Sequence, residues 1–67
     1  SIVLLSDSSV CRVIENRGDA PLKPVVKVII DSEGREYPRD DGPVVDLANS
    51  QKLFIARAVD ANSLTER

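Results

Sequence analysis

The feature that most constrains the fold is the run Val-Val-Lys-Val-Ile-Ile at residues 25–30. β-Branched side chains are restricted at χ1 and pack well on a pleated surface, so this run predicts a β-strand. Pro24 prevents a helix from continuing into it, because proline restricts its predecessor and donates no hydrogen bond. Successive side chains of a strand alternate between two faces. We expect the all-apolar face to lie in the core, and it consists of Val26, Val28 and Ile30.

The opposite face of this strand carries Val25, Lys27 and Ile29 and is apolar at two of its three positions. A strand that is apolar on both faces is expected inside a sheet rather than at its edge. Its second face is then either covered within the domain or contacts a partner. Val25, Lys27 and Ile29 are therefore the candidate interaction residues, with burial on both sides of the strand as the alternative.

Further short apolar runs, separated by turn-forming residues, predict the remaining strands. Five or six such strands at roughly ten-residue spacing are typical of an antiparallel all-β domain. For a chain this short we predict a small, strongly bent SH3-like barrel of about five strands, because closure removes unpaired edges. An OB-like barrel is the alternative. The apolar runs are residues 2–5, 10–15, 44–47 and 53–59, and residues 35–37 (Arg-Glu-Tyr) are expected to form a short return strand after the turn at residues 31–34.

The connections carry several expectations of their own. Residues 16–24 contain two prolines and a glycine and predict an irregular loop, with Leu22 tucked beneath it. Gly34 suits a positive-φ position in the turn that follows the run at residues 25–30. Residues 60–67 form a polar tail in which we expect a frayed turn of helix. The acidic side chains lack the ligand spacing of a calcium loop, so we expect exposed loop carboxylates at Asp31, Glu33, Asp40 and Asp41.

Composition limits the chemistry of the chain. Sixty-seven residues form one domain with a small core. There is no histidine, and Cys11 is the single cysteine, which we expect to be a small buried residue. The alternative is a reactive thiol beside Arg12. No Ser–His–Asp or Cys–His set and no phosphate-binding glycine loop is present. We therefore expect no catalytic residue, no metal site and no cofactor in this domain.

The charge and the aromatic content bear on partners and location. A net charge of −2 and only two aromatic residues, Tyr37 and Phe54, provide neither a basic surface nor a base-stacking platform, so we expect no nucleic-acid partner. We expect no membrane partner either, since no run is long enough to span a bilayer and no signal peptide is visible. The composition fits a cytoplasmic domain. Because the chain starts at Ser1 and contains no methionine, we expect residues 1–67 to be one domain of a longer protein.

Three segments together resemble a known family. They are residues 3–7 (Val-Leu-Leu-Ser-Asp), residues 19–34, and Val-Asp-Leu at 45–47 followed by Leu-Phe-Ile at 53–55. They resemble the small β-rich tail that follows the catalytic domain in many bacterial HD-GYP phosphohydrolases. The similarity covers residues 2–64, and its most specific part is Pro-Leu-Lys-Pro-Val-Val at 21–26 with Asp31 and Gly34 downstream. The sequence departs from the family pattern at Ser8, where a turn glycine is expected, at Val10-Cys11-Arg12, and at Lys23, which replaces arginine.

The resemblance implies a non-catalytic accessory, regulatory or packing domain of a bacterial signalling enzyme. The parent protein would be a metal-dependent phosphodiesterase of cyclic di-GMP or a related phosphohydrolase, and its metal ligands would lie in the upstream domain. The implied partner is that upstream catalytic domain or a second subunit. The alternative is an independent SH3-like module that binds a peptide or a nucleotide. Tyr37 gives little of the aromatic groove of a peptide-binding SH3 domain, and nucleotide binding would require Arg12, Lys23 and Lys27 to converge.

Overall fold

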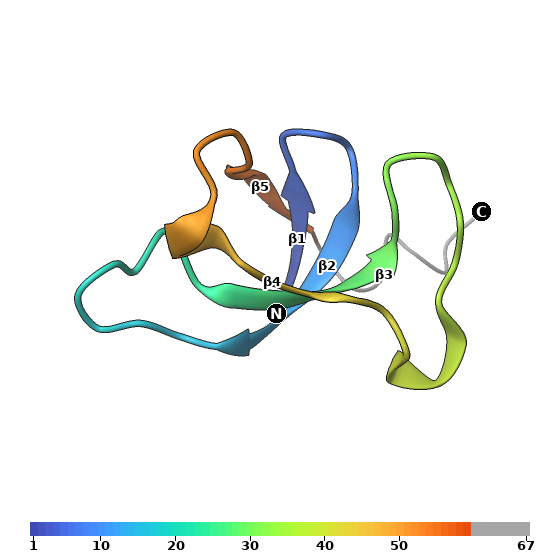
Figure 1. The fold of residues 1–67 in the computed structure, drawn as a ribbon, viewed down its shortest axis with the longest axis horizontal. Helices are drawn as coiled ribbons and strands as arrows, with labels where there is room; N and C mark the ends of the chain where they lie inside the picture. The colour runs from blue at the N-terminus through green and yellow to red at the C-terminus, as the bar shows by residue number, and fades with distance from the viewer. Residues whose placement is uncertain (60–67) are drawn as a thin grey trace.

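The computed structural model describes residues 1–59, which form a single five-stranded antiparallel sheet (Figure 1). Its strand order is β4-β3-β2-β1-β5, so β3 lies inside the sheet as predicted. The described residues confirm the predicted all-β class. The sheet is small and barrel-like but is not closed, because no pairing joins β4 to β5 within them. The strands are β1 (Ile2–Leu5), β2 (Val10–Glu15), β3 (Val25–Ile30), β4 (Val44–Asp46) and β5 (Ile55–Val59).

Three shifts in register bend this sheet. Two lie between β2 and β3, where Ile14 and Ile29 are each an extra residue opposite a continuous partner, and one lies between β1 and β5. Bulges of this kind increase the local twist and curve the strand. The shift at Ile29 also interrupts the alternation of β3, so Ile30 pairs with Val10 and is only half-buried. The prediction that Ile30 belongs to the core face was therefore wrong.

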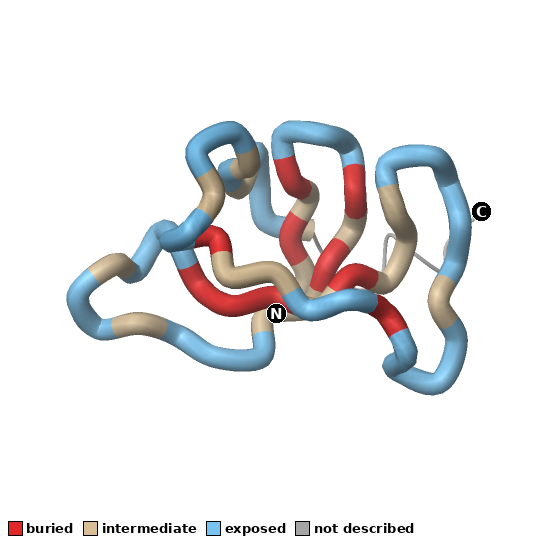
Figure 2. Tube along the Cα trace, in the orientation of Figure 1, coloured by how far each residue is buried: buried red, intermediate tan, exposed pale blue. Residues whose placement is uncertain are grey.

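The core lies on the concave side of the bent sheet. Cross-strand partners Val3, Cys11 and Val28 form one row across β1, β2 and β3, and all three are buried. Figure 2 shows the buried positions concentrated along these three strands. Full burial of a valine or leucine side chain contributes about 1.5–3 kcal/mol. Cys11 is 0% exposed, which confirms the small buried residue expected there. The buried cluster consists of Val3, Leu5, Cys11, Val26, Val28 and Leu47.

Short 3₁₀ segments replace part of the predicted strand structure. The predicted return strand at residues 35–37 is reduced to one bridge between Ile30 and Glu36, and η1 (Pro38–Asp40) follows it. The second segment, η2 (Leu47–Asn49), directly follows β4 and carries the fully buried Leu47 into the core. Leu47 therefore belongs to η2 and not to the strand predicted at residues 44–47.

The turns agree with some expectations and overturn one. Gly34 has a φ of 88°, as predicted for its turn. Ser8, which stands where the family resemblance expects glycine, has a φ of 75°. Leu22 is 79% exposed, so the prediction that it tucks beneath its loop was wrong. That loop is held by polar contacts of Arg17 instead. The tail predicted at residues 60–67 lies outside the described residues.

Candidate interaction surface

The candidate site is the face of the sheet opposite the core, which we call the outer face. Arg12 on β2, Lys27 on β3 and Val44 on β4 form one row across it, since each is the cross-strand partner of the next. Cross-strand partners lie side by side on the same face of a sheet. Val44 is 55% exposed and Ile14 is 41% exposed. The residues that define the outer face are Arg12, Ile14, Val25, Lys27, Val44 and Asp46.

The three candidate interaction residues occupy different environments on β3. Val25 is only 8% exposed, and it lies between Glu15 and Asp46 in the register. The Lys27 side chain keeps 24% of its surface exposed. Ile29 is the half-buried extra residue of a bulge. The structure places Val25 and Lys27 on one face but covers Val25, so a partner would meet Lys27 and its neighbour Val44 rather than Val25. The interface itself stays a prediction.

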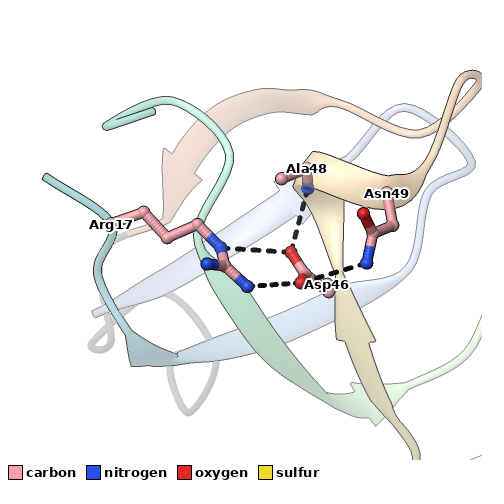
Figure 3. Close-up of polar contacts among 4 residues, drawn as sticks. All are labelled: Arg17, Asp46, Ala48 and Asn49. Atoms are coloured by element: carbon pink, nitrogen blue, oxygen red, sulfur yellow. Dashed lines mark hydrogen bonds and ion pairs between the residues drawn. The ribbon is translucent and has the colours of Figure 1, made fainter. Parts of the chain in front are cut away.

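An ion pair between Arg17 and Asp46 lies at one end of the outer face (Figure 3). The guanidinium uses two nitrogens: Nε donates to Asp46 Oδ1 at 3.3 Å, and Nη2 donates to Oδ2. Two-point contacts of this kind are stronger and more directional than a single hydrogen bond. The carboxylate of Asp46 raises the pKa of Arg17 through these hydrogen bonds and its charge.

Asp46 is held by backbone and side-chain donors in addition to Arg17. Its Oδ1 accepts the Ala48 N–H at 3.1 Å, so Asp46 is the N-cap of η2. Its Oδ2 accepts a hydrogen bond from Asn49 Nδ2 at 3.3 Å. Arg17 follows β2 and Asp46 ends β4, so their contact crosses the beginning of β3 near Val25. This pair joins the loop at residues 16–24 to the end of β4, a contact that sequence periodicity gave no means of finding.

A second Arg–Asp contact lies near the middle of the outer face. Arg12 Nη2 donates to Asp40 Oδ1 at 2.5 Å, and Lys27 Nζ donates to the Asp40 carbonyl at 3.1 Å. The hydrogen bond and charge of Arg12, followed by the charge of Lys27, lower the pKa of the Asp40 carboxyl. Of the three cations that a nucleotide site would need, the structure thus brings Arg12 and Lys27 together. Lys23 lies exposed in the loop before β3.

The aspartates of the family resemblance organise turns. Asp31 Oδ1 accepts the N–H groups of Glu33 at 3.0 Å and Arg35 at 2.9 Å, and Oδ2 accepts the Tyr37 hydroxyl at 3.2 Å. The backbone hydrogen bond from Arg35 is the main cause that lowers the Asp31 pKa. Asp7 accepts two hydrogen bonds from Ser9. These motif residues therefore fix local backbone geometry, as short Asp side chains do in turns.

Among residues 1–59, few features indicate catalysis or metal binding. Burial raises the pKa of the Cys11 thiol, and this keeps it in the unreactive neutral form. Residues 1–59 contain no cavity and no cluster of three acidic or cysteine side chains placed to hold a metal ion. No helix in that part of the chain is long and apolar enough to cross a membrane.

The bent five-stranded sheet defines a small SH3-like β domain. Residues 2–67 match the family model described as a KOW domain associated with HD domain, and the chain belongs to this family. The family relation inferred from the sequence, an accessory domain of HD-domain proteins, is thereby confirmed. No curated protein and no solved structure matches the chain.

Proposed function

We propose that this domain is a non-catalytic accessory domain that packs against the HD domain of the same protein and regulates it. The observation that carries the proposal is the family match over residues 2–67, whose description names the association with an HD domain. The residue inventory agrees, because the chain has no histidine with which to build an HD-type metal site of its own. The parent protein is then a metal-dependent phosphohydrolase of bacterial cytoplasmic signalling, with cyclic di-GMP as its substrate.

The outer face is the surface that we assign to this packing. Val44 is the exposed neighbour of Lys27 on β4, and Ile14, two residues beyond Arg12 on β2, is also exposed; clusters of exposed apolar groups mark interaction sites. The Lys27 side chain, between Arg12 and Val44 in the register, is partly exposed. This arrangement places two apolar residues near a charged pair, as in many interfaces with a polar component.

The first test compares the full-length protein with a form that lacks residues 1–67. Both are assayed for metal-dependent hydrolysis of cyclic di-GMP, and the oligomeric state of each is measured in parallel. We expect both forms to hydrolyse the substrate, with a change in assembly or in the response of the rate to effectors when the domain is removed. If deletion abolishes the chemical step in a protein whose HD domain remains folded and metal-loaded, a non-catalytic role is excluded.

The second test addresses the surface. In the full-length protein, the double variant Ile14→Thr and Val44→Thr keeps β-branched residues on the strands but makes both positions polar. We expect the packing equilibrium with the HD domain to weaken by about tenfold, because each substitution removes about one buried CH₂ group, which contributes about 0.8 kcal/mol. The population of compact molecules in small-angle X-ray scattering measures this change. The matched control is Leu22→Thr, which changes an even more exposed residue that lies off the outer face. Equal effects of the two variants would contradict the assignment.

A further inference from the structure

One short segment between β3 and β4 contacts Arg12 and Lys27 of the outer face through Asp40, and we call Pro38–Gly42 the strap. Its two ends are fixed to neighbouring residues of β3: the Tyr37 N–H donates to the Ile29 carbonyl, and the Val28 N–H donates to the Pro43 carbonyl, each at 2.9 Å. The strap therefore leaves β3 and returns to it almost at the same point. Between these fixed ends it has one internal backbone hydrogen bond, from Asp41 N–H to the Pro38 carbonyl at 3.1 Å.

The tip of the strap is held by Arg12 and Lys27, which contact the Asp40 carboxylate and, through Lys27 Nζ, its backbone carbonyl. Asp40 contacts Arg12 and Lys27, which are cross-strand partners on β2 and β3. The Asp40 side chain is 54% exposed and that of Arg12 is 40% exposed, and ion pairs exposed to this degree add little net stability. Arg39 and Asp40 have φ values of 57° and 62°, a left-handed conformation that disfavours side chains with a Cβ. The attraction at the tip is thus set against backbone strain at Arg39 and Asp40.

Asp40 also shows what the Arg12–Lys27 pair recognises. The two cations receive a carboxylate from one side, with a guanidinium nitrogen on one oxygen and an ammonium group 3.7 Å from the other. A carboxylate supplied from outside the domain would make the same contacts without requiring two left-handed residues. It would also reach the pair beside Val44, which is the exposed apolar residue next to Lys27.

We propose that Arg12 and Lys27 form a carboxylate-binding site that Asp40 occupies within the domain, and that a carboxylate side chain of the HD domain displaces Asp40 when the two domains pack together. The inference rests on the proposed function, because it specifies the chemistry of the same interface. The strap then acts as an internal competitor, and opening it is part of the packing reaction.

The test is carried out on the full-length protein and follows the sodium chloride concentration at which half of the molecules lose the compact arrangement. Salt weakens exposed charge pairs, so this midpoint reports the strength of the inter-domain ion pairs. We expect Asp40→Asn to raise the midpoint by about twofold, because it removes the competing charge, and Arg12→Gln to lower it by a similar factor. The matched control, Asp41→Asn, removes a strap carboxylate that within residues 1–59 pairs only with Arg39, and it leaves the midpoint unchanged.

A second measurement examines the strap in residues 1–67 without the HD domain. Backbone ¹⁵N relaxation of Arg39, Asp40 and Asp41 is expected to show greater mobility in Asp40→Asn and in Arg12→Gln than in Asp41→Asn. The competitor role is overturned if Asp40→Asn leaves the salt midpoint unchanged or lowers it, or if the three variants relax alike. If instead the wild-type protein is never compact at any salt concentration, the proposed packing function fails, and the displacement step fails with it.

Discussion

The two Arg–Asp contacts on the outer face use the same chemical groups but differ in how the aspartate is held. Asp46 accepts hydrogen bonds from Arg17, from the Ala48 backbone and from Asn49, and its side chain is 26% exposed. Asp40 lies on a strained strap, is 54% exposed, and is held, among residues 1–59, by Arg12 and Lys27. The Asp46 carboxylate stabilises the local backbone fold. The Asp40 carboxylate can be replaced at Arg12 and Lys27 by another carboxylate.

This difference shows that the backbone, and not the ion pair, decides whether a surface carboxylate is structural. A carboxylate that also caps a backbone N–H cannot leave without exposing that N–H, whereas a carboxylate on a loop tip leaves by rotation of a few dihedral angles. This contrast between Asp46 and Asp40 can be tested by substitution, beginning with Gly42, where the strap contacts β3.

Gly42 is the strap residue that approaches the β3 backbone closely, and its substitution is expected to have the largest effect on the free energy of unfolding. A Cβ on Gly42 would lie 1.7 Å from the Val28 carbonyl oxygen, so β3 and the strap must separate in Gly42→Ala. We expect a loss of about 3 kcal/mol in the free energy of unfolding, at the upper end of what overpacking usually costs. Urea denaturation measures it. Gly18→Ala is the control, because nothing lies within 4 Å of the added Cβ there; a comparable loss in both would show that the close approach is not the cause.

Asp46→Ala tests the anchored carboxylate. Loss of the N-cap of η2 alone is expected to lower the free energy of unfolding by about 1 kcal/mol. Asp46→Asn retains a side chain that caps well but removes the charge opposite Arg17, so it should recover most of that loss. If Asn and Ala are equally destabilising, then the charge of Asp46, rather than its hydrogen bond to the Ala48 N–H, stabilises this part of the domain. Asp46 and Asp40 would then both act through ion pairs alone.

Ser8→Gly isolates the effect of a left-handed residue in an anchored turn. Ser8 has a φ of 75°, and its N–H donates to the Leu5 carbonyl at 2.9 Å. Glycine adopts this conformation without a steric penalty but loses more entropy on folding, so the net gain should be small, about 0.5 kcal/mol in the free energy of unfolding. A destabilised Ser8→Gly variant in the same urea denaturation experiment would mean that the Ser8 side chain has a role of its own.

The pH dependence of Asp40 gives the smallest expected change in stability. Its pKa in the folded state lies below the ordinary 3.8, so its contribution is fully present above pH 3.8 and is lost as the pH falls through the lowered value. Arg12→Gln removes the main cause, and we expect the Asp40 pKa to move back toward 3.8 in a carboxyl NMR titration. Asp31 is an internal reference, because its lowered pKa derives chiefly from the Arg35 backbone N–H. A shift of both carboxyls in Arg12→Gln would indicate a general rearrangement instead.

Much of the fold followed from the sequence, because strand signals are local. The runs at residues 2–5, 10–15 and 25–30 became β1, β2 and β3 with the predicted bounds. Bulges are not local, because a bulge is a property of two strands in register. Nothing in Ile29 or Ile30 alone marks the extra residue that turns Ile30 out of the core row.

The candidate site was less accessible to sequence reasoning. Lys27 was identified because it interrupts an apolar strand, but its partners Arg12 and Asp40 are separated from it by 15 and 13 positions in the sequence. Long-range polar contacts leave no periodic signal, so Asp40 had no distinguishing mark among the acidic residues, and the motif that contains Asp46 did not reveal Arg17 as its partner. The turn at residues 31–34 was predicted from its composition, since Asp with Gly three residues later favours a closed turn.

The burial of Cys11 has a practical consequence for all of these measurements. As the single cysteine of the chain, with 0% of its surface exposed, it can react with a thiol reagent only in molecules whose core has opened. Strap opening moves residues on the other face of the sheet and leaves the thiol covered. The alkylation rate of Cys11 therefore reports opening of the core and is insensitive to opening of the strap. The domain can thus report, from its own sequence and without an added label, whether a variant has loosened one loop or the entire fold.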